Sequence, residues 1–404
     1  MKTNLSRRQL AAASLGLAAA AQRASSQVVV RPGAAQVAGP QAGMVSTYAS
    51  ALDGFESKVN MGSFDPVAWT KERYRKMPMR LSFKAKTKAQ AIAWQKQLRG
   101  KLTELVGGFP MTRVPLAPQT LEVRDFPTYR REKFVINTQE GMGLLGYLVT
   151  PKDRPGPLPA MICVPGHGRG VDDLVGIDDK GRDRTLRAHY QYDFALQCVE
   201  LGLAAVAIEP IAFGCRRDSR AQSRGLTNSV CQPTAGAALL FGQTMIGWRV
   251  YDVMRVCDWI ETRTELNAKR IGLMGISGGG TVTTFGAALE PRIHTAFISC
   301  YLNTFLASIV SMSHCIDNYV PGILNWCEMY DVAGLIAPRP LFVESGEKDN
   351  IFPLEASIES FNRVQKIYEV FGVAGNTSQE VFAGEHQFHG KQGLPFCVRH
   401  LSAV

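Results

Sequence analysis

The chain has 404 residues, of which 46% are hydrophobic and 20% are charged, and its formal net charge is +10. This is the composition of a globular protein with enough apolar material for a large core. The length allows several domains, or a single α/β domain with extensions. The sequence contains no run of Lys and Arg with interleaved aromatic residues, so the charge predicts a basic surface and argues against nucleic acid as a partner.

Residues 1–26 have the features of an export signal. Basic residues precede an apolar stretch at 10–21, and small residues suitable for cleavage follow it. Ser6-Arg7-Arg8-Gln9-Leu10 resembles a twin-arginine signal, so we expect a periplasmic or secreted protein. The alternative is an amphipathic N-terminal helix of a cytoplasmic protein. The apolar stretch is too short to span a bilayer comfortably, so no stable membrane insertion is expected.

The next two segments differ in composition. Residues 27–45 are rich in Ala, Gly and Pro, which predicts a linker. Residues 46–118 are predicted to form an N-terminal helical extension, because apolar residues recur there at helical spacing, namely Ile92, Leu98, Leu102 and Leu105. We expect this extension to pack on the main domain. Binding of a partner protein through the helix is the alternative.

From residue 119 to residue 404 the pattern indicates one catalytic domain. Three short segments of alternating polarity predict an antiparallel start, and buried strands then alternate with amphipathic helices. The expected strands are 121–126, 131–137, 144–151, 158–164, 204–210, 270–277, 293–301, 339–346 and 378–384, with helices at 184–201, 246–260, 278–289, 355–371 and 391–402. The predicted fold class is therefore α/β, with a mostly parallel central sheet and helices on both faces. Active-site groups are expected beyond the carboxyl ends of the strands.

Ser277 lies in the stretch Gly275-Ile276-Ser277-Gly278-Gly279, between a predicted strand and a predicted helix. A serine in a sharp strand-to-helix turn needs small neighbours, because the turn is strained and crowded. The motif alone is weak, but its position makes Ser277 the candidate nucleophile. A glycine-rich loop without catalytic function is the alternative.

A serine hydroxyl needs a base, and the base needs an orienting acid. Asp349 and His386 each follow a predicted strand, and the order Ser277, Asp349, His386 is that of the nucleophile-elbow architecture. We therefore predict His386 as general base and Asp349 as the acid. Glu347 could replace Asp349, and His389 could replace His386.

The oxyanion of an acyl-transfer intermediate needs two hydrogen-bond donors. The backbone N–H of Gly278 is one candidate. The second is expected in the loop after the first buried parallel strand, from the backbone of His167 or Gly168. A glycine-rich turn with no catalytic part is the alternative for this loop.

Further residues are candidates for substrate binding. Glu209 ends a predicted strand and could face the site or pair with Arg216 or Arg217. Residues 302–330 form an irregular insertion that could cap the pocket. Its candidates are His314, Asn318, Tyr319 and Trp326, although the aromatic residues could equally serve packing.

The nine cysteines show no metal-binding spacing. Because there is no C-x-x-C and no zinc pattern, we expect no metal and no cofactor. Cys163, Cys198, Cys257, Cys300 and Cys397 lie in apolar surroundings and are expected to be buried thiols. Cys215, Cys231, Cys315 and Cys327 lie in predicted loops, and their spacing does not reveal any pairing.

The stretches "PGHG", "GISGGG", "SGEKDNIFP" and "GEHQFHG" together resemble the α/β-hydrolase superfamily over residues 119–402. Within it they look like the branch of acetyl-xylan-esterase-like, dienelactone-hydrolase-like and prolyl-oligopeptidase-like enzymes. Three features depart from relatives. Many acetyl xylan esterases have Gln where this chain has Gly278, dienelactone hydrolases have Cys where it has Ser277, and many relatives begin the oxyanion loop with His-Gly where it has Pro165-Gly166.

The resemblance implies a serine carboxylesterase that cleaves small acyl or alkyl esters, with carbohydrate esters as one candidate class, through an acyl-enzyme on Ser277, and the N-terminal signal pattern adds the expectation that it is exported. The expected partner is a small-molecule or oligosaccharide ester, and the oligomeric state is left open. A peptidase or amidase of the prolyl-oligopeptidase-like branch is one alternative. A non-catalytic binding protein with the same fold is the other.

Overall fold

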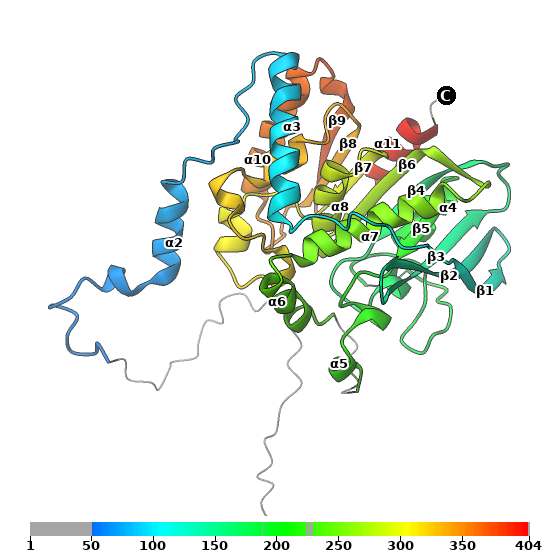
Figure 1. Cartoon of the computed structure of the whole chain (residues 1–404), viewed down its shortest axis with the longest axis horizontal. Coiled ribbons are helices and arrows are strands. Elements are labelled where there is room, and N and C mark those ends of the chain that lie inside the picture. The colour runs from blue at the N-terminus through cyan, green and yellow to red at the C-terminus, as the bar shows by residue number, and fades with distance from the viewer. Residues whose placement is uncertain (1–50, 188, 224, 226–228, 403–404) are drawn as a thin grey trace, which may run out of the picture. The chain divides into compact units, whose positions relative to one another are not determined.

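The computed structural model describes residues 51–187, 189–223, 225 and 229–402 (Figure 1). The predicted signal at 1–26 and the linker at 27–45 lie outside these residues. The boundary between the extension and the catalytic domain at 118/119 stays a prediction, because the chain from Ala49 onward clusters as one unit. None of the helices in the described residues is both long and apolar enough to span a membrane.

A nine-stranded sheet forms the centre of the described chain, with the strand order β1-β2-β3-β5-β4-β6-β7-β8-β9. The first three strands and β5 pair antiparallel, whereas β5, β4, β6, β7, β8 and β9 pair parallel. The strands are β1 Gln119–Asp125, β2 Tyr129–Gln139, β3 Met142–Pro151, β4 Leu158–Val164, β5 Ala204–Ile208, β6 Leu266–Ile276, β7 Ile293–Ser299, β8 Leu341–Gly346 and β9 Thr377–Phe382. The predicted fold class, with its antiparallel start, is confirmed.

Helices cover both faces of the sheet. The helices of the described residues are α2 Pro66–Arg75, α3 Lys88–Leu105, α4 Phe194–Glu200, α5 Ser219–Ser223, α6 Gln232–Leu240, α7 Met245–Ile260, α8 Gly278–Leu289, α9 Met329–Gly334, α10 Leu354–Val370 and α11 Gly393–Ser402. One core cluster joins the sheet to α3, α7, α8 and α10, and a second joins the opposite face to α4 and α11 (Figure 1).

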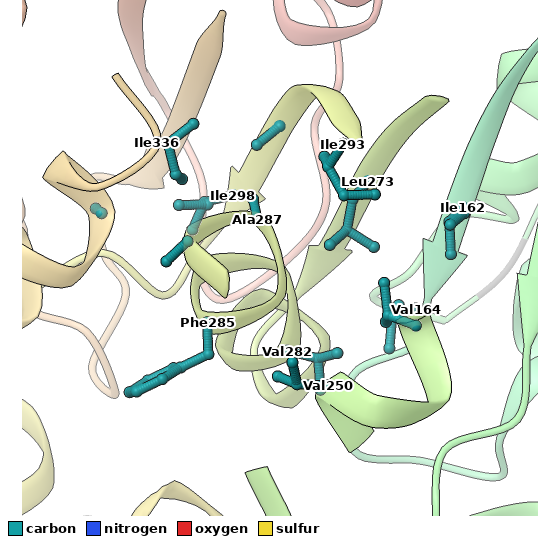
Figure 2. Packing of buried hydrophobic residues seen from close by; sticks show 14 of the residues in the cluster. Ile162, Val164, Val250, Leu273, Val282, Phe285, Ala287, Ile293, Ile298 and Ile336 are labelled. Carbon is teal, nitrogen blue, oxygen red and sulfur yellow. The ribbon is translucent and has the colours of Figure 1, made fainter. Parts of the chain in front are cut away.

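Strand β4 shows why both faces need cover. Its side chains alternate, so that Ile162 and Val164 enter the first cluster while Met161 and Cys163 enter the second. Figure 2 shows the first cluster, in which α8 contributes apolar side chains next to those of the neighbouring strands and α7. Because both faces of the sheet are buried, the strands rigidly support the loops that follow them.

Two predicted features of the helices are wrong. The helix expected at 184–201 begins only at Phe194, because Arg184 folds back to pair with Asp193, which has the left-handed φ of +49°. In α3, Ile92 is 52% exposed, and the helix instead buries a face that includes Leu98 and Leu102. A single apolar residue at helical spacing does not decide which face of a helix is buried.

The extension packs on the helical layer, as expected from its apolar spacing. Gln95 of α3 donates its side-chain N–H to the carbonyl oxygen of Ala337 at 2.6 Å, and Arg99 donates to the carbonyl of Leu335. Both carbonyls lie in the segment between α9 and β8. The contacts attach α3 to the catalytic domain.

Candidate active site

Ser277 lies at the carboxyl end of β6 in the strained turn that the motif predicts. Its φ is +57° and its ψ is −120°, a conformation that L-residues rarely adopt. A side chain on Gly275 would come within 2.5 Å of the Gly279 carbonyl, and one on Gly279 within 2.1 Å of the Val164 carbonyl. Only glycine fits at both positions. The turn places Ser277 at the N-terminus of α8, where negative charge is favoured.

Asp349 and His386 form a close pair. The Nδ1 of His386 lies 2.8 Å from Oδ2 of Asp349, which is only 5% exposed. The other carboxylate oxygen, Oδ1, accepts the backbone N–H of Ile351 at 2.9 Å and that of Phe352 at 3.0 Å. Because both oxygens are held, the carboxylate fixes the direction of the imidazole.

The second ring nitrogen of His386, Nε2, lies on the side of the ring opposite Asp349. This nitrogen is buried and has no hydrogen-bond partner among the described residues. The ring is held between Tyr190 and Phe352, whose centroids lie 5.8 and 5.7 Å away. A buried imidazole nitrogen without a partner is unusual in a folded protein, and it fits a group that awaits a proton donor.

Neighbouring contacts bring this pair to the same sheet edge as Ser277. The backbone N–H of Ser277 donates to the carbonyl of Ser299 at 3.1 Å. Cys300, which follows Ser299 in the chain, has its sulfur within 4.8 Å of a carboxylate oxygen of Asp349 and a ring nitrogen of His386. The four residues follow β6, β7, β8 and β9 in turn. The parallel strands therefore gather Ser277, Asp349 and His386 at one edge, as the strand-end rule predicts, although their roles stay a prediction.

The two sequence alternatives have other surroundings. Glu347 is exposed, whereas Asp349 is buried. His389 lies 3.4 Å from Oε1 of Glu380 and stacks on Phe382 at 4.7 Å. Neither residue takes part in the pair described above.

Glu344 is a buried carboxylate that the sequence reasoning missed. It accepts the hydroxyl of Ser299 at 2.6 Å and the backbone N–H groups of His389 and Gly390 at 3.1 and 2.8 Å. Burial raises the pKa of Glu344 to about 7. The residue ties the loop that carries His386 to β8. The only sequence signal was an acidic residue inside an otherwise apolar strand.

The loop after β4 passes directly over Ser277. A side chain at Gly166 would come within 3.1 Å of the Ser277 Cβ and within 2.2 Å of the Tyr190 hydroxyl. The backbone N–H of Gly166 donates to Gln191 at 2.8 Å, and that of Arg169 donates to Asp173 at 3.2 Å. His167 and Gly168, the two predicted donors, lie between these occupied groups.

The imidazole of His167 fills the space beside Gly278. A Cβ on Gly278 would come within 2.8 Å of Cε1 and 2.9 Å of Nδ1 of His167. The Nε2 of His167 lies 3.1 Å from Oδ2 of Asp317, which also accepts from the buried Arg249. Burial acts to lower the pKa of His167, but attraction to Asp317 outweighs it and raises that pKa to about 10.

Two cysteines lie beside this pair. The sulfur of Cys231 is 3.6 Å from the His167 Nε2 and 3.4 Å from Oδ2 of Asp317. A hydrogen bond with Cys315 lowers the pKa of the Cys231 thiol. His167, Cys231, Cys315 and Asp317 all place their potential ligand atoms within 4.8 Å of one another. Among the described residues, Cys300, Asp349 and His386 form the other such group.

The insertion at 302–330 brings some of its candidates to this edge. His314 lies against Phe352, the ring that also stacks on His386, with centroids 5.3 Å apart. Burial lowers the pKa of His314 to about 4. Asn318 is 2% exposed and accepts the Thr281 hydroxyl at 2.6 Å, which suits a fixed wall. Tyr319 is 40% exposed and donates its hydroxyl to the Ile309 carbonyl at 3.2 Å.

Trp326, predicted as a substrate contact, faces the extension instead. The guanidinium of Arg80 lies 4.1 Å from the centroid of its ring, and the ammonium of Lys101 lies 4.3 Å from it. The carbonyl of Trp326 accepts the N–H of Leu81 at 2.7 Å. Both cations belong to the extension, so the ring is engaged in cation–π contacts with that segment. The prediction is corrected: Trp326 joins the insertion to the extension.

Glu209 is also closed to a substrate, and Arg216, one of its two expected partners, forms its ion pair with Asp252 instead. The carboxylate of Glu209 is 4% exposed and accepts the backbone N–H of Val171 at 3.0 Å, with Gly170 and Gly214 packed against it. Arg216 donates to the carbonyl of Glu209 but pairs with Asp252 at 2.6 Å. Burial raises the pKa of Glu209 to about 8. The side chain therefore supports the loop after β4 from beneath.

Comparison with known proteins places the chain in a family. "Putative hydrolase YtaP" of Bacillus subtilis is 27% identical over 283 residues, which are 68% of this chain and 88% of that protein. A putative acetyl xylan esterase of Bacteroides fragilis superposes with a TM-score of 0.67 at 21% identity, covering 79% of this chain and 82% of that one. A glucuronoyl esterase of Solibacter usitatus gives a TM-score of 0.58 at 15% identity over 80% and 97% of the two chains. The model of the Abhydrolase family matches residues 70–395, and the chain therefore belongs to this family of α/β hydrolases.

Proposed function

We propose that the protein is an exported serine carboxylesterase that cleaves small acyl or alkyl esters. The proposal rests on the Nε2 of His386, which is buried and has no partner in the described part of the chain, and on Asp349, which fixes the ring at the sheet edge where Ser277 occupies its strained turn. A peptidase uses the same groups, so the choice of esterase rests on the named esterases among the structural relatives.

The mechanism follows from the positions of three groups. The Nε2 of His386 takes the proton of the Ser277 hydroxyl as the oxygen attacks the ester carbonyl. Asp349 stabilises the imidazolium that forms. His386 then gives the proton to the leaving alcohol, and an acyl-enzyme remains on Ser277. Water, deprotonated by His386, attacks this second ester and releases the acid.

The tetrahedral intermediate carries a negative oxygen that needs donors in place before the reaction. Gly278 begins α8, and we assign its backbone N–H as the first donor. The second donor is the backbone N–H of His167 or Gly168, since the flanking N–H groups of Gly166 and Arg169 are already bonded to side chains.

The substrate class is a carbohydrate ester. Two of the structural relatives are named for acetyl xylan and glucuronoyl esters, and the predicted twin-arginine signal would bring this chain to the compartment where such esters occur. His314 and the exposed Tyr319 would line the approach to the site.

The test uses Ser277→Ala, His386→Ala and the matched control His389→Ala. We expect the first two variants to lose turnover of p-nitrophenyl acetate and the third to keep most of it, because His389 pairs with Glu380 instead. A fluorophosphonate probe should label the wild type on Ser277. Lack of labelling in a folded wild type would favour a binding protein, and faster cleavage of acyl-amides than of esters would favour a peptidase.

A further inference from the structure

A cluster of four side chains lies beside the active site and has the composition of a metal centre. His167, Cys231, Cys315 and Asp317 offer one imidazole nitrogen, two sulfurs and one carboxylate oxygen, all within 4.8 Å of one another. The esterase mechanism uses none of the four side chains. They come from the loop after β4, the segment before α6 and the insertion.

The spacing of these atoms can be compared with a coordination sphere. Zinc binds sulfur at about 2.3 Å and nitrogen or oxygen at about 2.0–2.2 Å in a tetrahedron, which places ligand atoms about 3.3–3.8 Å apart. The measured separations are 3.1 Å from His167 Nε2 to Asp317 Oδ2, 3.4 Å from Asp317 to Cys231 Sγ, and 3.6 Å from Cys231 Sγ to His167. For these three pairs, shifts of a few tenths of an ångström would reach the separations of a coordination sphere, and the Cys315 sulfur lies within 4.8 Å of the other three atoms.

We propose that these four residues bind one zinc ion. The ligand atoms are Nε2 of His167, the two sulfurs of Cys231 and Cys315, and Oδ2 of Asp317. Sulfur and imidazole together select zinc over calcium or magnesium, which prefer oxygen.

The charges around the site balance with the ion in place. Two thiolates, one carboxylate and Zn²⁺ sum to −1, and the buried guanidinium of Arg249 adds +1. Arg249 contacts the ligand Asp317 and lies 3.4 Å from the sulfur of Cys231. Such hydrogen bonds to metal ligands hold them in place and offset their charge. On binding, the ion replaces the protons of both thiols and the proton shared by His167 Nε2 and Asp317, and these protons pass to the solvent.

The ion would be structural rather than catalytic. Four protein ligands complete a tetrahedral sphere, so no position stays open for water or substrate. Its effect on the active site is geometric: it joins the oxyanion loop to the insertion and fixes the His167 ring beside Gly278, where 2.8 Å separates that ring from the place of a Cβ. Zinc at this site would overturn the expectation of no metal that the cysteine spacing gave.

The test measures metal in the full chain, purified without chelator and with its thiols reduced. We expect about one zinc per chain by elemental mass spectrometry. Cys231→Ser and Cys315→Ser should lose it, whereas Cys257→Ala, which removes a thiol from the core face of α7, should keep it. Cobalt added to the metal-depleted protein should give thiolate charge-transfer bands and strong visible absorption of tetrahedral cobalt.

Two results would overturn the proposal. One is a folded wild type that takes up no zinc or cobalt after reduction and supplementation. The other is a Cys231–Cys315 disulfide, seen as the loss of two hydrogens in mass, with no metal binding after its reduction. Ser277→Ala should still bind zinc, so failure of the esterase proposal and failure of the metal proposal are separable.

Discussion

Replacing Asp349 with Asn tests the catalytic pair without removing its support. The amide oxygen can still accept the N–H groups of Ile351 and Phe352, which lie 2.9 and 3.0 Å from Oδ1. The amide nitrogen then takes the place of Oδ2, 2.8 Å from Nδ1 of His386. Because an amide nitrogen donates, Nδ1 must accept, and the proton moves to Nε2. His386 can then no longer act as a base toward Ser277.

The expected loss in kcat is about 10⁴-fold, the size seen when a triad acid becomes an amide. This corresponds to about 5.5 kcal/mol of transition-state stabilisation, at 1.36 kcal/mol for each tenfold change. The free energy of unfolding should fall by only about 1–2 kcal/mol, because the two backbone hydrogen bonds persist. The assays are p-nitrophenyl acetate kinetics and urea unfolding. Glu347→Gln is the matched control, and a kcat within tenfold of wild type for Asp349→Asn would refute the assignment.

Three further predictions concern neighbouring parts of the structure. Gly278→Ala should lower kcat about 10²-fold or more, since the added Cβ displaces His167 from beside the oxyanion donor; unchanged kcat would argue against this site. Trp326→Ala should leave KM within about twofold and lower the free energy of unfolding by about 2 kcal/mol, because it loses two cation–π contacts; a large rise in KM would restore its substrate role. Glu209→Gln should make stability less dependent on pH. The folded-state pKa of Glu209, about 8, exceeds the usual 4.5, so ionisation of Glu209 lowers the free energy of unfolding of the wild type as the pH rises from about 5 to 8, by a few kcal/mol at most. The measurement is urea unfolding of the wild type and the variant at about pH 5 and about pH 8. A difference in unfolding free energy between the two proteins that is the same at both pH values would contradict this prediction.

The sequence predicted what depends on local pattern and on strand ends. Apolar strands alternating with helices indicated a parallel sheet, and the carboxyl ends of parallel strands share an edge. That rule, together with the glycines around Ser277 and the order of the three residues in the chain, selected Ser277, Asp349 and His386, and the structure brings Asp349 and His386 together. Their roles stay predictions until tested.

The rest depends on contacts between residues that are distant in the sequence. Cys231 and His167 are 64 positions apart, so no spacing rule for metal ligands could detect them. For Trp326 the sequence left substrate binding and packing equally open, because an aromatic residue in an irregular insertion has no periodicity that tells which way it faces. Glu209 was similar: its buried partner, the N–H of Val171, is a backbone group that carries no side-chain signal.

The anchoring of Trp326 has a consequence for how the chain can be shortened. Three residues of the extension contact the insertion. Arg80 and Lys101 lie over the ring of Trp326, and the hydroxyl of Tyr74 donates to the carboxylate of Glu328 at 3.0 Å. His314 and Asn318 stand on that same insertion. Deleting the extension would therefore reshape the wall of the substrate approach while every proposed catalytic residue remained in the chain. Substrate range and thermal stability would then change together, so the two traits could not be engineered independently through this segment.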